Sequence, residues 1–238
     1  MKVVSQTKMH HDCNDCIQPN PSYFCNLSRE TFQSFKAIKI TSTYPKGARL
    51  FIEGQPCDGV YMVCQGRVKL TTHSRSGKAL ILRIAVPGEV LGLSAAVSNF
   101  LHETTAEVIE PCQVNFIRTS DFCRLLERNA DAGLNAIQQL SLQYRTAHVQ
   151  IRSLGLSSCV ADKLSRLLLE WAKSVQSSNG SVRLKVTFSH EEIAEMIGTS
   201  RETITRALKD FRERGLIEIK GSELYIADKH KLEATIGN

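Results

Sequence analysis

The chain has 238 residues and a mass of 26.5 kDa, a length that suits two domains better than one. Hydrophobic residues make up 42% of it and charged residues 23%, a balance that excludes disordered and collagen-like chains. No apolar run reaches the roughly 18 residues of a membrane span and the N-terminus lacks the apolar core of a secretion signal, so we expect a cytoplasmic protein with no membrane partner. The formal charge of +6 permits an anionic partner, but residues 181–238 hold ten basic and ten acidic side chains, which excludes a basic tail.

The first 26 residues form a polar segment that holds three of the eight cysteines. Cys13, Cys16 and Cys25 lie in it, together with two prolines. Because no export signal is present, we expect a reducing compartment, where disulfides are rare. Clustered cysteines in that setting indicate metal binding or redox chemistry. We predict that the other isolated cysteines are small buried core residues: Cys57, Cys64, Cys123 and Cys159.

From about Ile38 to Arg118, short apolar and β-branched runs alternate with glycines. Glycine supplies the positive φ that tight turns need, and many short strands at this spacing are typical of an antiparallel roll or sandwich. We therefore predict a compact β-domain in this region. Its expected strands are Ala48–Ile52, Val60–Cys64, Arg67–Thr72, Ala79–Ala85 and Cys112–Ile117.

After Ser120 the apolar pattern changes to steps of three and four residues. This period predicts a long helix over about Ala130–Leu154 that pairs with the same helix of a second copy, although a helix packed on its own domain gives the same stripe. A helix over about Ser158–Val175 and a strand over Val182–Phe188 are expected next. The seam residues of the long helix are Ala130, Gly133, Ile137, Leu140, Tyr144, Ala147, Ile151 and Leu154.

The most specific pattern in the chain begins at Ser189. Ser189 and Glu192 have the spacing of a capping box, and the helix that they open ends at Gly198. Ser200 begins a second helix two residues later, so the two helices must cross steeply, as in a helix-turn-helix whose second helix enters the DNA major groove. The following hairpin, Leu216–Ile226, is expected to be the wing. The buried positions of the two helices are expected to be Ile193, Ala194, Ile197, Ile204, Leu208 and Phe211.

The exposed side of the second helix carries side chains that suit DNA. Arg201 and Arg206 can each donate two hydrogen bonds to guanine, and Glu202 can accept one from cytosine N4. The small hydroxyl residues suit phosphate or a thymine methyl group, and the remaining basic residues suit phosphate. The expected DNA-binding residues are Ser200, Arg201, Glu202, Thr205, Arg206 and Lys209, with Arg212 and Arg214 as further phosphate contacts.

Three segments in this order carry a family resemblance. HEEIAEMIGTSRETITRALKDFRERGLIEIKG resembles the winged helix-turn-helix of the Crp/Fnr family of bacterial transcription factors, and GQPCDGVYMVCQGRVKL and PGEVLG resemble its cyclic-nucleotide-binding-type β-roll. The long helix lies where the family dimerises. The resemblance implies an α+β chain with an N-terminal antiparallel β-roll. Its parts would be a Cys-containing extension at 1–26, the β-roll sensor domain at 27–126, a dimerisation helix at 127–156 and a winged helix-turn-helix DNA-binding domain at 157–238.

The resemblance also implies a function and partners. It implies a homodimer that binds double-stranded DNA at a TGTGA-like palindrome through Arg201, Glu202 and Arg206, with RNA polymerase as a further partner. We therefore expect a transcription regulator and not an enzyme. The enzymatic alternative is a thiol oxidoreductase using Cys13 and Cys16, but this pair lies in a polar extension without the βαβ pattern of such enzymes.

The family's nucleotide pocket gives one candidate sensor site. The resemblance places Gly88, Glu89, Glu103 and Thr104 there. In family members that bind cAMP an Arg-Ser pair stands about where Glu103 and Thr104 do, and a carboxylate repels a cyclic phosphate. We therefore expect that the pocket serves as scaffold and does not bind cAMP. A cyclic-nucleotide-responsive regulator of the same fold is the alternative.

The cysteines give the other candidate sensor. Their arrangement resembles the oxygen-sensing Fnr branch, which implies a [4Fe–4S] cluster on Cys13, Cys16, Cys25 and Cys112. Zinc or a thiol redox switch that includes His10 or His11, and a chain without metal, are the alternatives. In each case the signal would shift the pairing of the long helices, and thereby the spacing of the two recognition helices.

Overall fold

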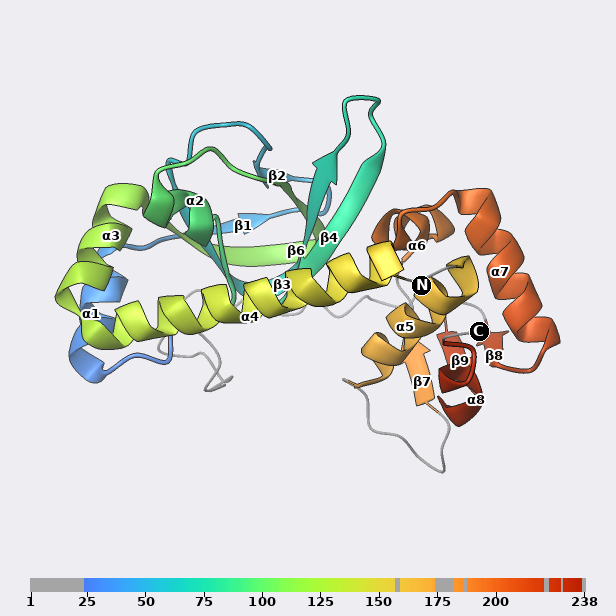
Figure 1. Ribbon diagram of the computed structural model, residues 1–238. Helices are drawn as coiled ribbons and strands as arrows, with labels where there is room; N and C mark the ends of the chain where they lie inside the picture. The colour runs from blue at the N-terminus through green and yellow to red at the C-terminus, as the bar shows by residue number, and fades with distance from the viewer. Residues whose placement is uncertain are drawn as a thin grey trace, which may run out of the picture. The chain divides into compact units, whose positions relative to one another are not determined.

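Figure 1 shows the computed structural model, which describes residues 24–156, 159–173, 182–185, 188–220, 223–227 and 229–236. The chain forms two compact units. The first comprises the described residues up to Thr72 together with Leu82–Arg145, and the second comprises His73–Ile81 and the described residues from Thr146 onward. Within these ranges, no helix combines the length and the apolar character that crossing a membrane requires.

The strand-and-glycine pattern forms an antiparallel sheet, as predicted. Within the described residues the sheet has six strands in the order β1-β6-β3-β4, with β2 on β6 and β5 on β3. The strands β3 and β6 pair along most of their length, from Gly59 opposite Arg118 to Thr71 opposite Thr105. The strands are β1 (Ile40–Tyr44), β2 (Arg49–Phe51), β3 (Gly59–His73), β4 (Ala79–Ala85), β5 (Val90–Leu91) and β6 (Thr105–Arg118).

One long strand replaces two predicted short ones, Val60–Cys64 and Arg67–Thr72. Gly66 lies between them with φ 85°, and the pairing register shifts on both sides of it. A Cβ atom at Gly66 would lie 2.3 Å from the carbonyl oxygen of Pro111 and 2.6 Å from Sγ of Cys112. The glycine therefore continues the strand through a bulge and lets two backbones approach closely, where we had predicted a break.

Helices cover one side of the sheet, and two apolar clusters fill the unit. The helices are α1 (Arg29–Ile38), α2 (Leu93–Ser98) and α3 (Thr119–Arg128). The cluster that joins helices to the sheet consists of Phe24, Phe35, Val60, Met62, Val90, Leu93, Ala96, Ile117, Phe122, Leu125, Ala132 and Ala136. The cluster among the strands consists of Leu50, Phe51, Val63, Val68, Leu70, Ala85, Leu91, Ala106, Val108, Cys112 and Val114.

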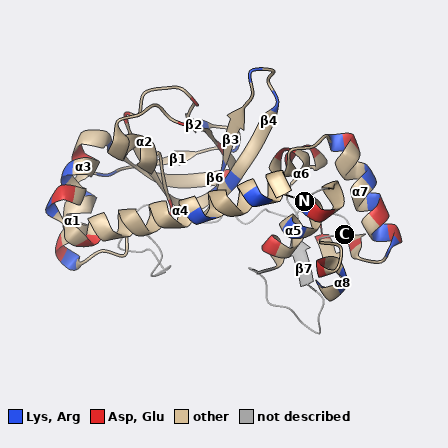
Figure 2. Cartoon of the chain, in the orientation of Figure 1, with Lys and Arg blue, Asp and Glu red and all other residues tan. Residues whose placement is uncertain are grey.

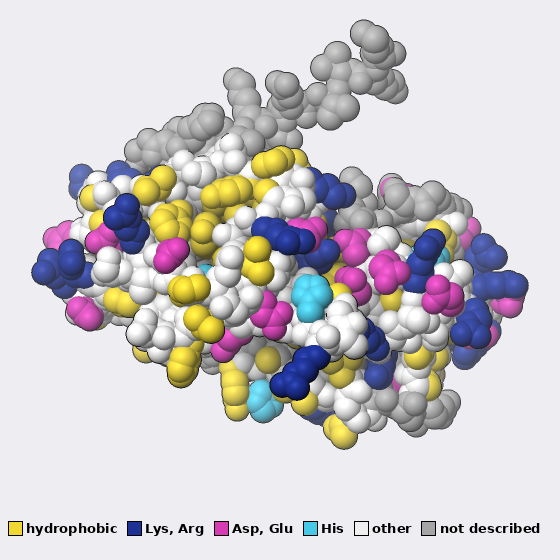
Figure 3. Space-filling model, turned by 90° about the horizontal axis from the view of Figure 1, so that it is seen from above, with side chains coloured by type: hydrophobic (Ala, Val, Ile, Leu, Met, Phe, Trp, Pro, Cys, Tyr) yellow, Lys and Arg dark blue, Asp and Glu magenta, His cyan; other side chains and the backbone are white. Residues whose placement is uncertain are grey.

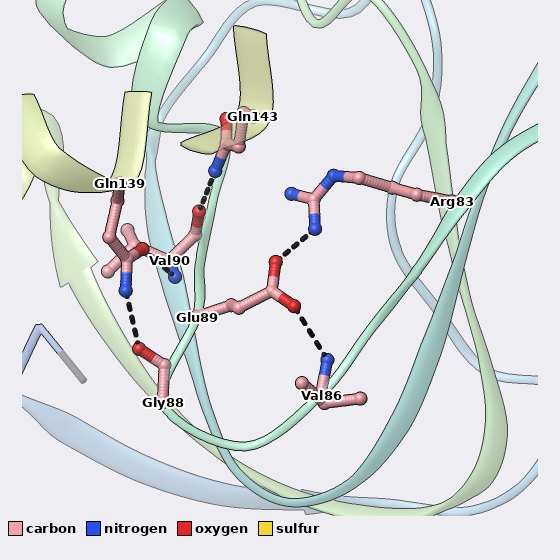
Figure 4. Close-up of polar contacts among 7 residues, drawn as sticks. All are labelled: Arg83, Val86, Gly88, Glu89, Val90, Gln139 and Gln143. Atoms are coloured by element: carbon pink, nitrogen blue, oxygen red, sulfur yellow. Dashed lines mark hydrogen bonds and ion pairs between the residues drawn. The ribbon is translucent and has the colours of Figure 1, made fainter. Parts of the chain in front are cut away.

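The predicted long helix is α4 (Ala130–Leu156), and one of its amide side chains is buried against the loop before β5. Gln139 is 6% exposed. Its Nε2 donates to the carbonyl oxygen of Gly88 at 2.7 Å, and its Oε1 accepts from the amide of Val90 at 2.9 Å (Figure 4). Gln143 adds a longer bond to the carbonyl oxygen of Val90 at 3.4 Å. The loop is thus paired with α4 much as it would be with a neighbouring strand.

The second unit contains a helical bundle and a small sheet. The sheet has the order β7-β9-β8, and both pairings are antiparallel. The predicted helix over 158–175 and the predicted hairpin after residue 215 are confirmed. The elements are α5 (Val160–Lys173), β7 (Val182–Lys185), α6 (His190–Ile197), α7 (Arg201–Glu213), β8 (Ile217–Lys220), β9 (Glu223–Ile226) and α8 (Lys229–Glu233).

The bidentate contact of Gln139 predicts a stability difference between neighbouring glutamines. Gln139→Ala should lower the free energy of unfolding by about 1–3 kcal/mol, because the buried Val90 amide loses this acceptor and the Gly88 carbonyl keeps only the Phe24 amide, at 3.2 Å. Gln138→Ala is the matched control, since Gln138 is exposed and its loss should change stability by no more than about 0.5 kcal/mol. Urea unfolding of the two variants beside the wild type measures both. Equal losses would mean that the contact contributes nothing.

Candidate nucleic-acid interface

The turn between α6 and α7 fixes the two helices against each other. The predicted capping box is present: Ser189 Oγ accepts from the amide of Glu192 at 3.2 Å, and the Glu192 carboxylate accepts from the amide of Ser189 at 2.9 Å. Gly198 ends α6 at φ 71°, a conformation that strains residues with a Cβ atom. Ser200 then caps α7 by accepting from the amide of Thr203 at 3.3 Å. The turn therefore begins at the left-handed backbone of Gly198 and ends at the side-chain cap of Ser200.

The helix α7 has one buried face and one exposed face. Ile204 and Phe211 are fully buried and Leu208 is 4% exposed, which confirms the predicted apolar face. Lys and Arg residues recur along α7, with Asp and Glu residues between them (Figure 2), and dark blue and magenta side chains adjoin one another at the right-hand edge of Figure 3, where α7 lies. The exposed face holds the sequence-predicted DNA-binding residues Arg201, Glu202, Thr205, Arg206 and Lys209, and Ser200 lies exposed at the start of the helix.

Electrostatics keep Glu202 ionised on this face. A hydrogen bond from its own backbone N–H, a hydrogen bond to the Ser200 side chain and the charges of Arg201 and Arg206 hold the pKa of Glu202 below its ordinary value. An ionised carboxylate has only acceptor sites. Glu202 can therefore accept from an amino group of a base between two arginines that can donate.

Lys209 and Arg214, near the end of α7, form surface ion pairs. Lys209 Nζ lies 3.7 Å from a carboxylate oxygen of Glu213, and Arg214 lies 3.2 Å from one of Asp210. The side chains in these pairs are half-exposed or more, and such pairs contribute little to stability. These ion pairs can therefore be exchanged for contacts with DNA phosphates at a small cost in stability.

One contact on this face was missed by sequence reasoning. His190, the first residue of α6, lies 2.9 Å through Nδ1 from Oγ1 of Thr205 on α7. Thr205 also donates to the carbonyl oxygen of Arg201 at 3.0 Å. The only sequence signal was a histidine directly after a helix cap, and helical periodicity cannot show that its ring reaches the next helix.

The predicted wing forms as a hairpin beside this pair of helices. β8 pairs with β9 from Ile217 opposite Ile226 to Lys220 opposite Glu223. Residues 221 and 222, which the sequence places at its tip, lie outside the described residues. The hairpin backbone is the part of the wing that the structure establishes.

Two of the four candidate effector residues of the roll, Gly88 and Glu89, bond to residues outside the candidate set. Glu89 forms an ion pair with Arg83, and its other oxygen accepts from the amide of Val86 at 3.1 Å (Figure 4). Gly88 is buried and bonded to Gln139. Arg83 and Gln139 were both missed by sequence reasoning, because strand and helix patterns do not show which polar residues meet across a loop.

The other two candidate effector residues lie in the bend that leads into β6. Glu103 is exposed and Thr104 half-buried. Among the described residues no hydrogen bond or ion pair joins either of them to Glu89. A shared site for the four residues therefore stays a prediction.

The described cysteines do not converge. Cys112 is fully buried among the strands, where its thiol donates to the carbonyl oxygens of Arg67 at 3.4 Å and Glu110 at 3.1 Å. Burial raises the pKa of Cys112 to about 11. Cys25 packs against the other cluster, the one that joins helices to the sheet. Cys13 and Cys16, with His10 and His11, lie outside the described residues, and within the described ranges no three His, Cys, Asp or Glu side chains could hold a metal ion.

The isolated cysteines are less buried than predicted. Cys57, Cys64 and Cys123 are half-buried, and each donates a hydrogen bond to a backbone carbonyl. Cys159 is exposed, so its prediction as a core residue was wrong. It lies directly before α5, where the chain has not yet entered the core.

The helix α4 carries exposed apolar residues along the predicted seam. Ile137, Tyr144 and Ile151, seven residues apart, are 64%, 66% and 67% exposed. The alternating seam positions Leu140 and Leu154 are half-buried. A second seven-residue series of exposed apolar residues lies on another face of α4, because each of its positions is five residues, about 140° around the helix, from a position of the first series. That series is Leu142, Val149 and Leu156.

Comparison with known proteins places both units. The family described as "Crp-like helix-turn-helix domain" matches residues 162–235, and that described as "Cyclic nucleotide-binding domain" matches residues 41–129. The "CRP-like cAMP-activated global transcriptional regulator" of Mycobacterium tuberculosis is 25% identical over 79% of this chain and 84% of its own. The "Transcriptional activator protein anr" of Pseudomonas aeruginosa is 26% identical over 100% of this chain and 96% of its own length.

A solved structure supports the same fold. FixK2 from Bradyrhizobium japonicum aligns with a TM-score of 0.72 at 21% identity, over 84% of this chain and 98% of that one. At this identity the likeness concerns the fold alone. The matched order of roll, long helix and helix-turn-helix, together with relatives that are named as transcription regulators, shows that the chain belongs to the Crp/Fnr family of DNA-binding transcription regulators.

Proposed function

We propose that the chain regulates transcription as a homodimer that reads a TGTGA-like palindrome and responds to a signal at the roll or the N-terminal cysteines. One observation carries the DNA-reading part. Arg201, Glu202 and Arg206 are exposed together on α7, and the capped turn after Gly198 fixes the start of that helix. A rigid frame that presents two bidentate donors and one acceptor suits a G·C-containing half-site.

The exposed stripe of α4 supports the homodimer. Large apolar residues that are about two-thirds exposed at a seven-residue spacing fit a second copy of the same helix, because that spacing keeps one face toward a partner. A two-fold dimer presents two copies of α7 to the two halves of a palindrome. RNA polymerase is a further partner in this proposal, on the family resemblance.

The contacts within the roll favour a regulator whose signal is not cAMP. Each carboxylate oxygen of Glu89 already accepts a hydrogen bond, one from Arg83 and one from the Val86 amide, so a ribose hydroxyl would meet a carboxylate that is already paired within the roll. Glu103 adds a negative charge where a cyclic phosphate would need a positive one. The alternative rests on the tuberculosis relative, whose name includes cAMP activation.

An iron–sulfur cluster on four cysteines does not fit Cys112 as the structure has it. The four ligands of a cluster must meet at one site, whereas Cys112 is fully buried in the apolar cluster among the strands and Cys25 packs against the other apolar cluster. A redox or metal role for Cys13, Cys16 and Cys25 is therefore proposed without Cys112, and no step of the regulation is assigned to a cluster.

The base-reading role of Arg206 predicts a change in preference. Arg206→Ala should weaken binding to a TGTGA palindrome by about 1–3 kcal/mol, roughly five- to 150-fold, and relax discrimination against a scrambled duplex. Lys209→Ala should weaken both duplexes alike and lower the salt dependence by about one ion, as a phosphate contact does. Mobility-shift titrations at several salt concentrations measure both. A uniform loss in the Arg206 variant would identify it as a phosphate contact, and no selectivity in the wild type would refute the proposed function.

The dimer predicts a position-specific effect of charge on α4. Ile151→Asp should weaken dimerisation by about 2 kcal/mol or more, because the new carboxylate is desolvated in the interface. Val97→Asp is the matched control: Val97 is also an exposed apolar residue, 51% against 67%, but it lies on α2. Sedimentation equilibrium gives both dissociation constants. Equal effects, or none, would show that α4 is not the interface.

The raised pKa of Cys112 predicts its reactivity. At pH 8 a thiol of pKa about 11 is thiolate in about one molecule in a thousand, so native alkylation should spare Cys112 and modify the exposed Cys159. Peptide mass mapping after iodoacetamide treatment measures this. Protein purified without oxygen extends the test through its visible spectrum and its iron and sulfide content. Iron that is present in the wild type and lost in Cys112→Ala would show that Cys112 is a ligand after all.

A further inference from the structure

The hydroxyl group of Thr205 forms two hydrogen bonds within the protein, although the residue lies exposed on the predicted DNA-facing side of α7. Oγ1 donates its hydrogen to the carbonyl oxygen of Arg201 at 3.0 Å, one turn back along the helix. The same oxygen lies 2.9 Å from Nδ1 of His190 on α6. A threonine hydroxyl has a single hydrogen, so the histidine must be the donor in the second bond.

These two bonds fix the rotamer of Thr205 from both sides. The bond to Arg201 is the back-bond that threonine makes within helices. The bond from His190 adds a restraint from another helix, and the capping box at Ser189 fixes the backbone from which His190 projects. The hydroxyl is therefore directed along the helix and toward α6. Of the two heavy atoms on the Thr205 Cβ, only the methyl carbon is left without a partner.

We propose that the Thr205 methyl group reads the C5 methyl group of a thymine in the half-site. An apolar contact of this kind distinguishes thymine from the other bases in the major groove. Thr205 lies one turn after Arg201 and directly before Arg206, so the thymine neighbours the base pairs that the arginines contact. This inference rests on the proposed function and adds the group that reads a thymine.

A phosphate contact by Thr205 would require a different arrangement. Phosphate oxygens are acceptors, and the single hydroxyl hydrogen of Thr205 already goes to Arg201. A phosphate bond would therefore leave the Arg201 carbonyl without this donor and break the alignment with His190. The hydrogen bonds favour the methyl group as the reading atom.

Replacing thymine by uracil in the DNA tests the contact, since this removes the methyl group and keeps every hydrogen-bonding atom. Each thymine of the preferred half-site is replaced in turn, on either strand, and dissociation constants are measured by fluorescence anisotropy. For the wild type we expect one replacement to weaken binding about fourfold, the equivalent of one buried methyl group. Thr205→Ser keeps the hydroxyl and removes the methyl. The thymine-to-uracil ratio, the affinity for the thymine duplex divided by the affinity for the uracil duplex, should therefore fall to about one in this variant.

Two further variants separate the methyl contact from the fold. Thr205→Val keeps a methyl group and removes the hydroxyl, so it should retain the thymine-to-uracil ratio. Thr203→Ser makes the same exchange on another side of α7, where Thr203 bonds to Ser200, and should leave the ratio unchanged. Thermal unfolding of each variant verifies that it is folded.

The outcomes test the thymine contact separately from the proposed function. Selective binding of the palindrome with no weakening at any replaced thymine overturns the methyl contact and leaves the proposed function standing. A ratio that Thr205→Ser retains and Thr205→Val abolishes also overturns it, in favour of the hydroxyl. Failure of the wild type to prefer the palindrome over a scrambled duplex refutes both.

Discussion

The left-handed turn at Gly198 is the constraint on which the DNA-reading surface depends. A chain that must leave one helix and cap the next within two residues has few conformations open to it, and glycine admits the one that the helices require. Because Ser189 and Ser200 cap the helices on either side, the position of every α7 side chain follows from local backbone geometry. The arginines, Glu202 and Thr205 are thus placed before any ligand arrives, which reduces the ordering cost of binding.

The same locality explains why this part could be predicted from the sequence. A capping box, a glycine stop and a second cap act over a few residues, and the apolar faces of α6 and α7 have the period of a helix. Both apolar faces, the capping box at Ser189 and the helix end at Gly198 were predicted, whereas Ser200 was predicted as the start of α7 and as a DNA contact but not as a cap. The contact between His190 and Thr205 was not predicted, because it joins residues fifteen positions apart on different helices, and no periodic pattern encodes such a pairing.

The roll shows the opposite case. The sequence pattern predicts its fold class and most of its strands, but it also predicts a break at Gly66, where the strand continues through a bulge, and it does not predict the helix α1. The reason is that strand pairing and bulges are settled by distant residues, here Pro111 and Cys112 against Gly66. For α4 the period was predicted correctly, yet it could not show that Gln139 would be buried or that Glu89 would meet Arg83.

The way in which Gln139 holds the roll has a consequence for how such a sensor can diversify. Its amide bonds only to backbone atoms of the loop, at Gly88 and Val90. Since a backbone contact does not depend on side-chain identity, the outward side chains of this loop can change without loosening the long helix from the roll. The backbone contacts that attach the loop to α4 and the side chains that could select a ligand therefore lie within a few residues of each other and can change independently. A chain built in this way can change the side chains of this loop by substitution while the attachment of α4 to the loop is inherited unchanged.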